Sequence, residues 1–160
     1  MITLVLGGAR SGKSAFAERL ASGTGRPVTY LATAIVGDDQ DFADRVRLHR
    51  ERRPREWRTV ECGADLPAAL HTATDTALVD SLGTWIAGLR NFEADTDGLC
   101  EALRSRQGES IVVSEEVGLG VHPSTAVGGS FRDRLGELNR AVSDIADRAY
   151  LVVAGRALTL

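Results

Sequence analysis

Short apolar runs alternate along this chain with longer stretches whose apolar positions recur at helical spacing. The runs at residues 2–6, 27–32, 57–61, 76–80, 110–114 and 149–154 predict strands. The stretches at 13–20, 40–53, 66–73, 82–89, 99–106 and 130–147 predict helices, with a loop at 91–98 and a short tail to residue 160. Strands that alternate with helices are typical of an α/β fold. We therefore predict one domain over residues 1–160, a mostly parallel sheet with helices on both faces.

The helix predicted over 130–147 has the clearest pattern of these segments. Its apolar positions recur at alternating spacings of four and three, with charges on the other side: Phe131, Leu135, Leu138, Val142 and Ile145. We expect this stripe to lie in the core or at a subunit contact.

A glycine-rich motif follows the first predicted strand and opens the first predicted helix. It reads G-x-x-x-x-G-K-S, which is the P-loop pattern in the strand–turn–helix setting that the P-loop requires. Its residues are Gly7, Gly8, Ala9, Arg10, Ser11, Gly12, Lys13 and Ser14. The glycines leave backbone N–H groups free to face phosphate oxygens, and the helix N-terminus adds partial positive charge. We expect Lys13 to contact the β- and γ-phosphates of a nucleotide and the Ser14 hydroxyl to ligate Mg²⁺.

Lysine occurs at one position only in the whole chain, in that motif. Of 19 basic residues, Lys13 is the single lysine and the other 18 are arginine. A compact ammonium on a flexible stem suits the phosphate cradle, whereas arginine's planar fork does not. This bias strengthens the prediction of nucleoside triphosphate binding.

Composition excludes several classes of function. The chain of 160 residues is 43% hydrophobic and 26% charged, with a net charge of −3, which is ordinary for a globular domain and argues against broad nucleic-acid binding. No apolar run is long enough to span a bilayer, and residues 2–6 are too few for a signal peptide. Cys62 and Cys100 lack metal-site spacing, which favours a reduced, cytoplasmic setting.

Acidic residues follow two of the predicted strands. Asp80 ends the apolar run 76–80, which is the pattern of a Walker B aspartate placed to support Mg²⁺; the alternative is a structural strand-end residue. After the strand 110–114, the segment Glu115-Glu116-Val117-Gly118-Leu119-Gly120 resembles an active-site loop.

Seven arginines surround one histidine between residues 45 and 58. A solvated basic helix face would explain the arginines alone. However, Phe42, Val46 and His49 fall at i, i+4 and i+7, which puts the histidine on the apolar face of the predicted helix. A cationic patch beside a triphosphate site stabilises charge in phosphoryl transfer and favours the neutral imidazole. We therefore interpret His49 as a nucleophile.

The order and spacing of these motifs resemble those of a known family. The segments that carry the resemblance are residues 7–14, 30–33, 45–50, 57–61, 78–82, 116–120 and 131–139, so it covers nearly the whole chain. The family is that of the bifunctional adenosylcobinamide kinase/adenosylcobinamide-phosphate guanylyltransferase of cobalamin biosynthesis.

This resemblance implies a RecA-like P-loop fold, usually a homotrimer, and two reactions. The kinase step moves a γ-phosphoryl group from ATP or GTP to a hydroxyl of adenosylcobinamide. In the transferase step a histidine attacks the α-phosphorus of GTP, releases pyrophosphate, carries GMP and passes it to the phosphorylated corrinoid, giving adenosyl-GDP-cobinamide.

The resemblance also assigns roles to individual positions. The guanylylated histidine falls on His49, with Lys13 and Asp80 as the other catalytic residues and Ser14 and Asp80 as the Mg²⁺ ligands. Further nucleotide contacts fall, beyond the P-loop and Asp80, on Thr33, Ala34, Ile35, Arg50, Glu51, Arg52, Arg53 and Glu61. His71 and His122 match no residue of known role in the family.

The chain departs from the family pattern at several points. The family often has Asn where this chain has Ser114 or Glu115. The segment 91–107 is short and acidic, and Gly128 and Gly129 replace bulkier residues.

Two other functions stay open on the sequence. One is a plain small-molecule kinase in which His49 and the arginines only bind phosphates. The other is a nucleotide-dependent switch ATPase. A nucleotide–protein adduct would distinguish the bifunctional kinase/guanylyltransferase from the plain kinase. A phosphorylated small-molecule product would exclude the switch ATPase.

Overall fold

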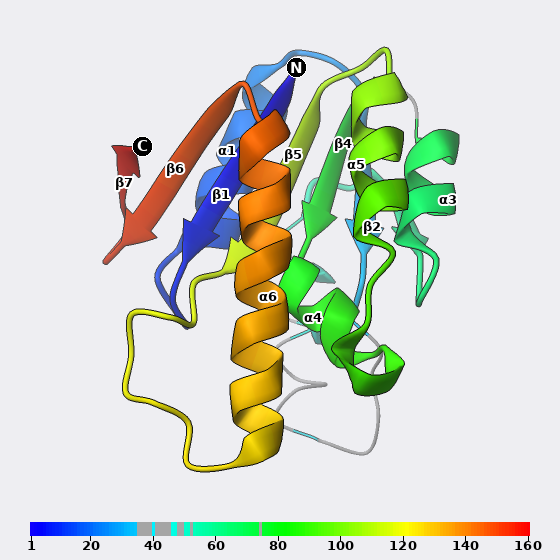
Figure 1. Cartoon of the computed structure of the whole chain (residues 1–160). Coiled ribbons are helices and arrows are strands. Elements are labelled where there is room, and N and C mark those ends of the chain that lie inside the picture. The colour runs from blue at the N-terminus through cyan, green and yellow to red at the C-terminus, as the bar shows by residue number, and fades with distance from the viewer. Residues whose placement is uncertain (35–39, 41–45, 48–49, 52, 74) are drawn as a thin grey trace.

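A seven-stranded sheet forms the centre of the computed structural model, which describes residues 1–34, 40, 46–47, 50–51, 53–73 and 75–160 (Figure 1). The strand order is β3-β2-β4-β5-β1-β6-β7. The strands are β1 (Ile2–Gly7), β2 (Val28–Ala32), β3 (Arg58–Glu61), β4 (Thr76–Asp80), β5 (Ser110–Glu115), β6 (Arg148–Val153) and β7 (Arg156–Thr159). The helices are α1 (Lys13–Gly23), α3 (Leu66–Thr72), α4 (Leu82–Ala87), α5 (Thr96–Ser105) and α6 (Ala126–Ile145), with a 3₁₀ turn at Arg90–Phe92.

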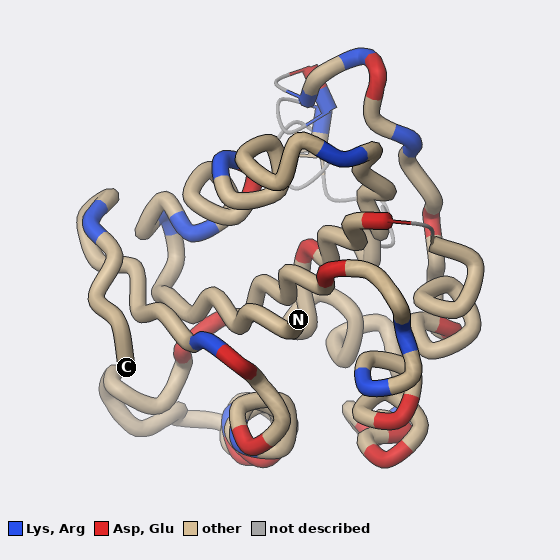
Figure 2. Tube along the Cα trace, turned by 90° about the horizontal axis from the view of Figure 1, so that it is seen from above, with Lys and Arg blue, Asp and Glu red and all other residues tan. Residues whose placement is uncertain are grey.

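Helices cover both faces of this sheet, as the sequence predicted. Helix α1 packs on one face through Ala17 and Ala21, and α3, α4, α5 and α6 cover the other (Figure 1). Residues of β1, β4 and β5 are almost wholly buried because both faces are covered, which explains their continuous apolar runs. Figure 2, seen from above, shows acidic and basic positions spread over both helical layers.

All strands except β7 run parallel to their neighbours. Strand β1 pairs with β5 and β6, and β4 pairs with β2 and β5. Their carboxyl ends therefore meet at one edge of the sheet, where ligands bind in open α/β folds. The segment predicted as a tail forms β7, which pairs antiparallel with β6, so that expectation was wrong.

Two helices begin earlier than the apolar pattern indicated. Helix α5 begins at Thr96, since the Asp95 side chain accepts from the backbone N–H of Gly98 (2.9 Å). Helix α6 begins at Ala126, and the Thr125 hydroxyl accepts from Gly128 N–H (3.1 Å). In both cases a polar cap satisfies free N–H groups of a first turn that buries no apolar side chain ahead of the predicted stripe. The α6 stripe is confirmed as core.

The helix predicted over 40–53 is described only in part. Residues 40, 46–47 and 50–51 are helical, and Pro54 follows as expected. Arg53 is described and lies outside a helix, whereas residues 41–45, 48–49 and 52, including the predicted nucleophile His49, lie outside the described residues.

Candidate functional site

The P-loop joins β1 to α1 in a conformation that glycines make possible. Gly12 has a φ of 92° and precedes the first residue of α1, Lys13. A side chain at Gly7 would lie 2.5 Å from Ser11 Oγ, whereas nothing lies within 4 Å of a side chain built at Gly8. The loop is thus packed from below at Gly7 and open above Gly8, which leaves room for a phosphate to approach the backbone.

Ser14 and Asp80, the two predicted Mg²⁺ ligands, meet across the edge of the sheet. The Ser14 hydroxyl donates to Asp80 Oδ1 (3.2 Å), and the Tyr30 hydroxyl donates to Asp80 Oδ2 (2.8 Å). Side chains alternate between the two faces of a sheet, and Leu78 and Tyr30 both belong to the core on the α1 face, which explains why Tyr30 and Asp80 are in contact. Asp80, two residues after Leu78, faces the same way.

Tyr30 keeps its proton because of this environment. Burial raises the pKa of its phenol, and the neighbouring Asp80 carboxylate raises it further. The phenol therefore acts as a fixed hydrogen-bond donor that orients Asp80.

These groups fit Mg²⁺ binding. A serine hydroxyl and a carboxylate are hard oxygen donors, and Mg²⁺ bound with a nucleotide takes few protein ligands besides phosphate oxygens and water. No cluster of three or more His, Cys, Asp or Glu side chains suited to a metal occurs in the described part of the chain. Such a small ligand set suits a metal that arrives with its nucleotide.

Glu115, the last residue of β5, connects the P-loop to α4. Its Oε1 lies 3.3 Å from Lys13 Nζ. The Ser81 hydroxyl donates to the carboxylate (2.9 Å), and Gly83 N–H donates to Oε2 (3.1 Å). Lys13 Nζ also lies 3.5 Å from the carbonyl of Gly8. The ammonium is thus held beside the phosphate cradle.

Thr33 lies beneath the site rather than in it. Its buried hydroxyl donates to the Ser81 carbonyl (2.7 Å) and lies 2.6 Å from Thr84 Oγ1. Ser81 also caps α4, so this hydroxyl network fixes the turn that follows Asp80.

A cavity of about 510 Å³ opens over these groups. Among the described residues, four cationic ones line it, Arg10, Lys13, Arg50 and Arg53, against two carboxylates, Asp80 and Glu115. An excess of positive charge around a concave site favours a polyanion. Ala9, Ser11, Gly12, Ser14 and Ala34 also line this cavity, which brings most predicted contacts together.

Arg53 is poised to receive an anion. Its guanidinium lies over the Tyr30 ring, 3.4 Å from the centroid. Its Nε and Nη1 are buried without a hydrogen-bond partner among the described residues. Buried donors of this kind cost free energy unless a ligand satisfies them, so Arg53 fits its predicted role.

Other predicted residues lie outside the cavity lining. Glu61 pairs with Arg50, and Glu51 pairs with Arg47 on the helix surface. Ile35, His49 and Arg52 lie outside the described residues, so their roles stay predictions.

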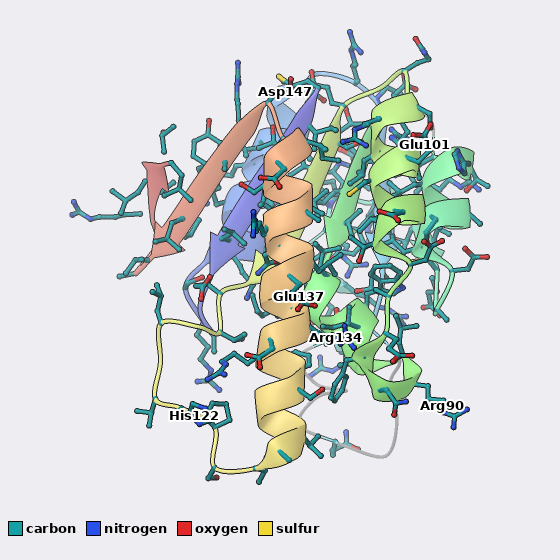
Figure 3. The ribbon with its side chains drawn as sticks, viewed as in Figure 1. Arg90, Glu101, His122, Arg134, Glu137 and Asp147 are labelled. Atoms are coloured by element: carbon teal, nitrogen blue, oxygen red, sulfur yellow. The ribbon has the colours of Figure 1, made fainter. Side chains whose placement is uncertain are left out.

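The two other histidines lie on the surface. His71 is exposed at the end of α3. His122 is exposed in the loop between β5 and α6, and its Nδ1 lies 2.9 Å from the Pro123 carbonyl (Figure 3). Neither residue lines the cavity.

Sequence reasoning missed Tyr30 and left Glu115 without a role. A tyrosine in a buried strand beside a strand that ends in Asp was the available signal for Tyr30. Nothing in the sequence pairs Glu115 with Lys13, because that contact depends on β5 lying next to β1.

Comparison with known proteins identifies relatives over the full length. A family model described as cobinamide kinase / cobinamide phosphate guanyltransferase matches residues 3–160. A Pseudomonas aeruginosa protein named bifunctional adenosylcobalamin biosynthesis protein CobP is 38% identical, covering 100% of this chain and 97% of its own. The Escherichia coli protein named bifunctional adenosylcobalamin biosynthesis protein CobU is 32% identical, covering 97% of each chain.

A solved structure shares the fold. The flagellar accessory protein FlaH from Methanocaldococcus jannaschii superimposes with a TM-score of 0.57 at 17% identity, over 99% of this chain and 77% of the other. This likeness supports the RecA-like P-loop architecture.

Proposed function

Because the chain belongs to the cobinamide kinase / cobinamide phosphate guanyltransferase family, we propose that it performs both reactions at the carboxyl edge of its sheet. It phosphorylates adenosylcobinamide and then transfers GMP from GTP to the product. The observation that carries this assignment is the cationic cavity over the P-loop, with the Ser14–Asp80 pair on its floor.

In the kinase step the P-loop holds the triphosphate. Backbone N–H groups around Gly8 and Gly12 face its oxygens, and Lys13 binds the β- and γ-phosphates. Ser14 and Asp80 would hold Mg²⁺, which neutralises phosphate charge when bound. Arg53 donates its unpaired N–H groups to the same polyanion.

In the transferase step His49 attacks the α-phosphorus of GTP. The bond from imidazole nitrogen to phosphorus forms as the bond to pyrophosphate breaks, and pyrophosphate leaves with the electron pair. Arg50 and Arg53 line the cavity, where they stabilise the developing charge. The phosphate of the phosphorylated corrinoid then displaces the histidine.

The test is a nucleotide–protein adduct. With α-labelled GTP and Mg²⁺, the protein should gain the mass of one guanylyl group (GMP less one water), and His49→Ala should lose that adduct and guanylyl transfer. The bond should be labile to acid and stable to base, as expected for a phosphoramidate. His49→Ala should retain much of its kinase activity, which needs no such nucleophile.

Two controls complete this experiment. His122→Ala, at an exposed loop residue outside the cavity, should form the adduct normally. Lys13→Ala should lose both activities while staying folded, since the P-loop serves both reactions. An adduct that persists in His49→Ala, or that maps to another residue, would leave the plain-kinase alternative ahead.

The same assignment carries two expectations about the protein in the cell. We expect a homotrimer, which sedimentation would measure, and a cytoplasmic location. None of the helices that the structure describes is long and apolar enough to cross a membrane.

A further inference from the structure

The two proposed reactions differ in whether the nucleophile carries a proton. The kinase step starts from an alcohol, whose O–H bond must break. Guanylylation starts from a neutral imidazole nitrogen, and the final transfer starts from a phosphate oxygen. A proton acceptor therefore serves the kinase step alone.

Two carboxylates are available among the described residues that line the cavity. Asp80 already accepts from Ser14 and Tyr30 and is the carboxylate that fits Mg²⁺. Glu115 is the other.

Glu115 lies beside the group that is transferred. Its Oε1 is 3.3 Å from Lys13 Nζ, the atom that binds the terminal phosphates in a P-loop, and its side chain is 26% exposed. A bound triphosphate carries more negative charge than one carboxylate and draws the ammonium toward itself. The side of Oε1 that Lys13 occupied then faces the cavity.

Contacts that do not involve Lys13 also hold the carboxylate. Ser81 Oγ and Gly83 N–H hold it from α4, and Asn139 Nδ2 donates to the Glu115 backbone carbonyl (3.0 Å). Gly83 leaves space for it, since a Cβ there would overlap the carboxylate. A group held this firmly is suited to act on a positioned substrate.

We propose that Glu115 is the proton acceptor of the kinase step, an inference that rests on the function proposed above. The acceptor hydroxyl attacks the γ-phosphorus, and its proton passes to Glu115 Oε1. The bond from γ-phosphorus to the bridging oxygen breaks, and the electron pair leaves with the nucleoside diphosphate. The carboxylic acid then returns its proton to water.

Ser114 is not an alternative, because its hydroxyl is buried and donates to Asn139 Oδ1 (2.6 Å).

The test compares four measurements on Glu115→Gln, which keeps the size of the side chain and an oxygen acceptor. Turnover in the kinase step should fall about 100-fold, the range of general-base catalysis. Binding of ATP should not weaken, since no cation–phosphate contact is lost. Formation of the GMP adduct, and its transfer to cobinamide phosphate supplied directly, should stay within about threefold of wild type. Normal adduct formation and normal GMP transfer also show that the variant is folded.

Two further variants sharpen the result. Glu115→Asp keeps a carboxylate and should retain more kinase turnover than Glu115→Gln. Glu101→Gln removes the same charge from α5, away from the strand ends that carry the site (Figure 3), and should behave as wild type.

Three outcomes are decisive. Kinase turnover of Glu115→Gln near the wild-type value overturns the inference. Parallel losses in kinase turnover, adduct formation and ATP affinity also overturn it, because Glu115 then acts only through Lys13. A wild-type protein without kinase activity instead refutes the proposed function.

Discussion

The Cys62 thiol lies half-buried beside the candidate site, and its pKa depends on the packing there. Its thiol donates to the Ala32 carbonyl (3.1 Å), and burial raises its pKa to about 11. It directly follows Glu61, a predicted nucleotide contact, and packs against the core under α3 and α4.

We expect this thiol to make stability depend on pH under alkaline conditions. The unfolded thiol ionises near pH 8.5, before the folded one, so ionisation favours the unfolded state. The protonated thiol's contribution to the free energy of unfolding is fully present below about pH 8.5 and is lost as the pH rises toward 11. Urea unfolding of wild type and Cys62→Ala at pH 8 and pH 10.5 measures this loss. The wild type should lose more stability than the variant, and equal losses would contradict the assigned environment.

Residues of the site differ in how far the sequence could predict them. Lys13, Ser14 and Asp80 were predictable, because a motif fixes the first two and the strand-end rule the third. Tyr30 and Glu115 were not, because their contacts with Asp80 and Lys13 depend on which strands become neighbours. For His49 the sequence and the family resemblance carry the whole argument.

At the scale of elements, Arg106 joins the ends of two helices to the sheet. Its guanidinium donates to the carbonyls of Leu70 (3.0 Å) and Asp75 (2.9 Å), and its Nε donates to Ser110 Oγ (3.1 Å). It thereby satisfies carbonyl groups at the end of α3 and fixes the turn before β5. Burial lowers its pKa.

Arg106→Ala should lower the free energy of unfolding by about 3 kcal/mol, since several carbonyls lose their donor. Arg106→Lys should recover little, because an ammonium lacks the planar fork. Arg104→Ala, exposed on the same helix, should change stability by less than about 0.5 kcal/mol. Denaturant unfolding measures all three, and similar values for Arg104 and Arg106 would refute this role.

The elements themselves were largely predictable from the apolar pattern. Buried strands gave continuous runs, and the stripe of α6 was clear. The errors came where the apolar pattern carries no signal. The polar caps Asp95 and Thr125 start helices before the first buried apolar residue, and β7 is exposed at the sheet edge, so it has no apolar run.

At the scale of the whole molecule, a turn late in the chain packs against the P-loop near its start. Gly155, in the turn between β6 and β7, donates its N–H to the Ser11 carbonyl (2.8 Å). Its Cα would lie 3.3 Å from a Cβ at Gly12, so the turn packs directly against the loop. The backbone of the phosphate cradle is therefore supported by the last residues of the sheet.

Gly155→Ala should weaken ATP binding through this contact. Gly155 has a φ of 77°, so the substitution strains the turn by about 1 kcal/mol. Gly25→Ala is the matched control, since Gly25 has a φ of 66° at the far end of α1 and the same open surroundings. Both variants should lose similar stability in thermal unfolding, and only Gly155→Ala should raise the Kd for ATP. Equal ATP affinities would show that the turn does not support the loop.

The position of β1 between β5 and β6 also bears on how the protein is made. The ribosome synthesises the P-loop first, yet both neighbours of its strand come from residues 110–153, and the supporting turn follows them. Pairings between such distant segments form late, because a long loop must close first. A nascent chain should therefore be unable to bind ATP until nearly all of it has left the ribosome. Free nucleotide would then stabilise finished molecules and give no help to incomplete ones.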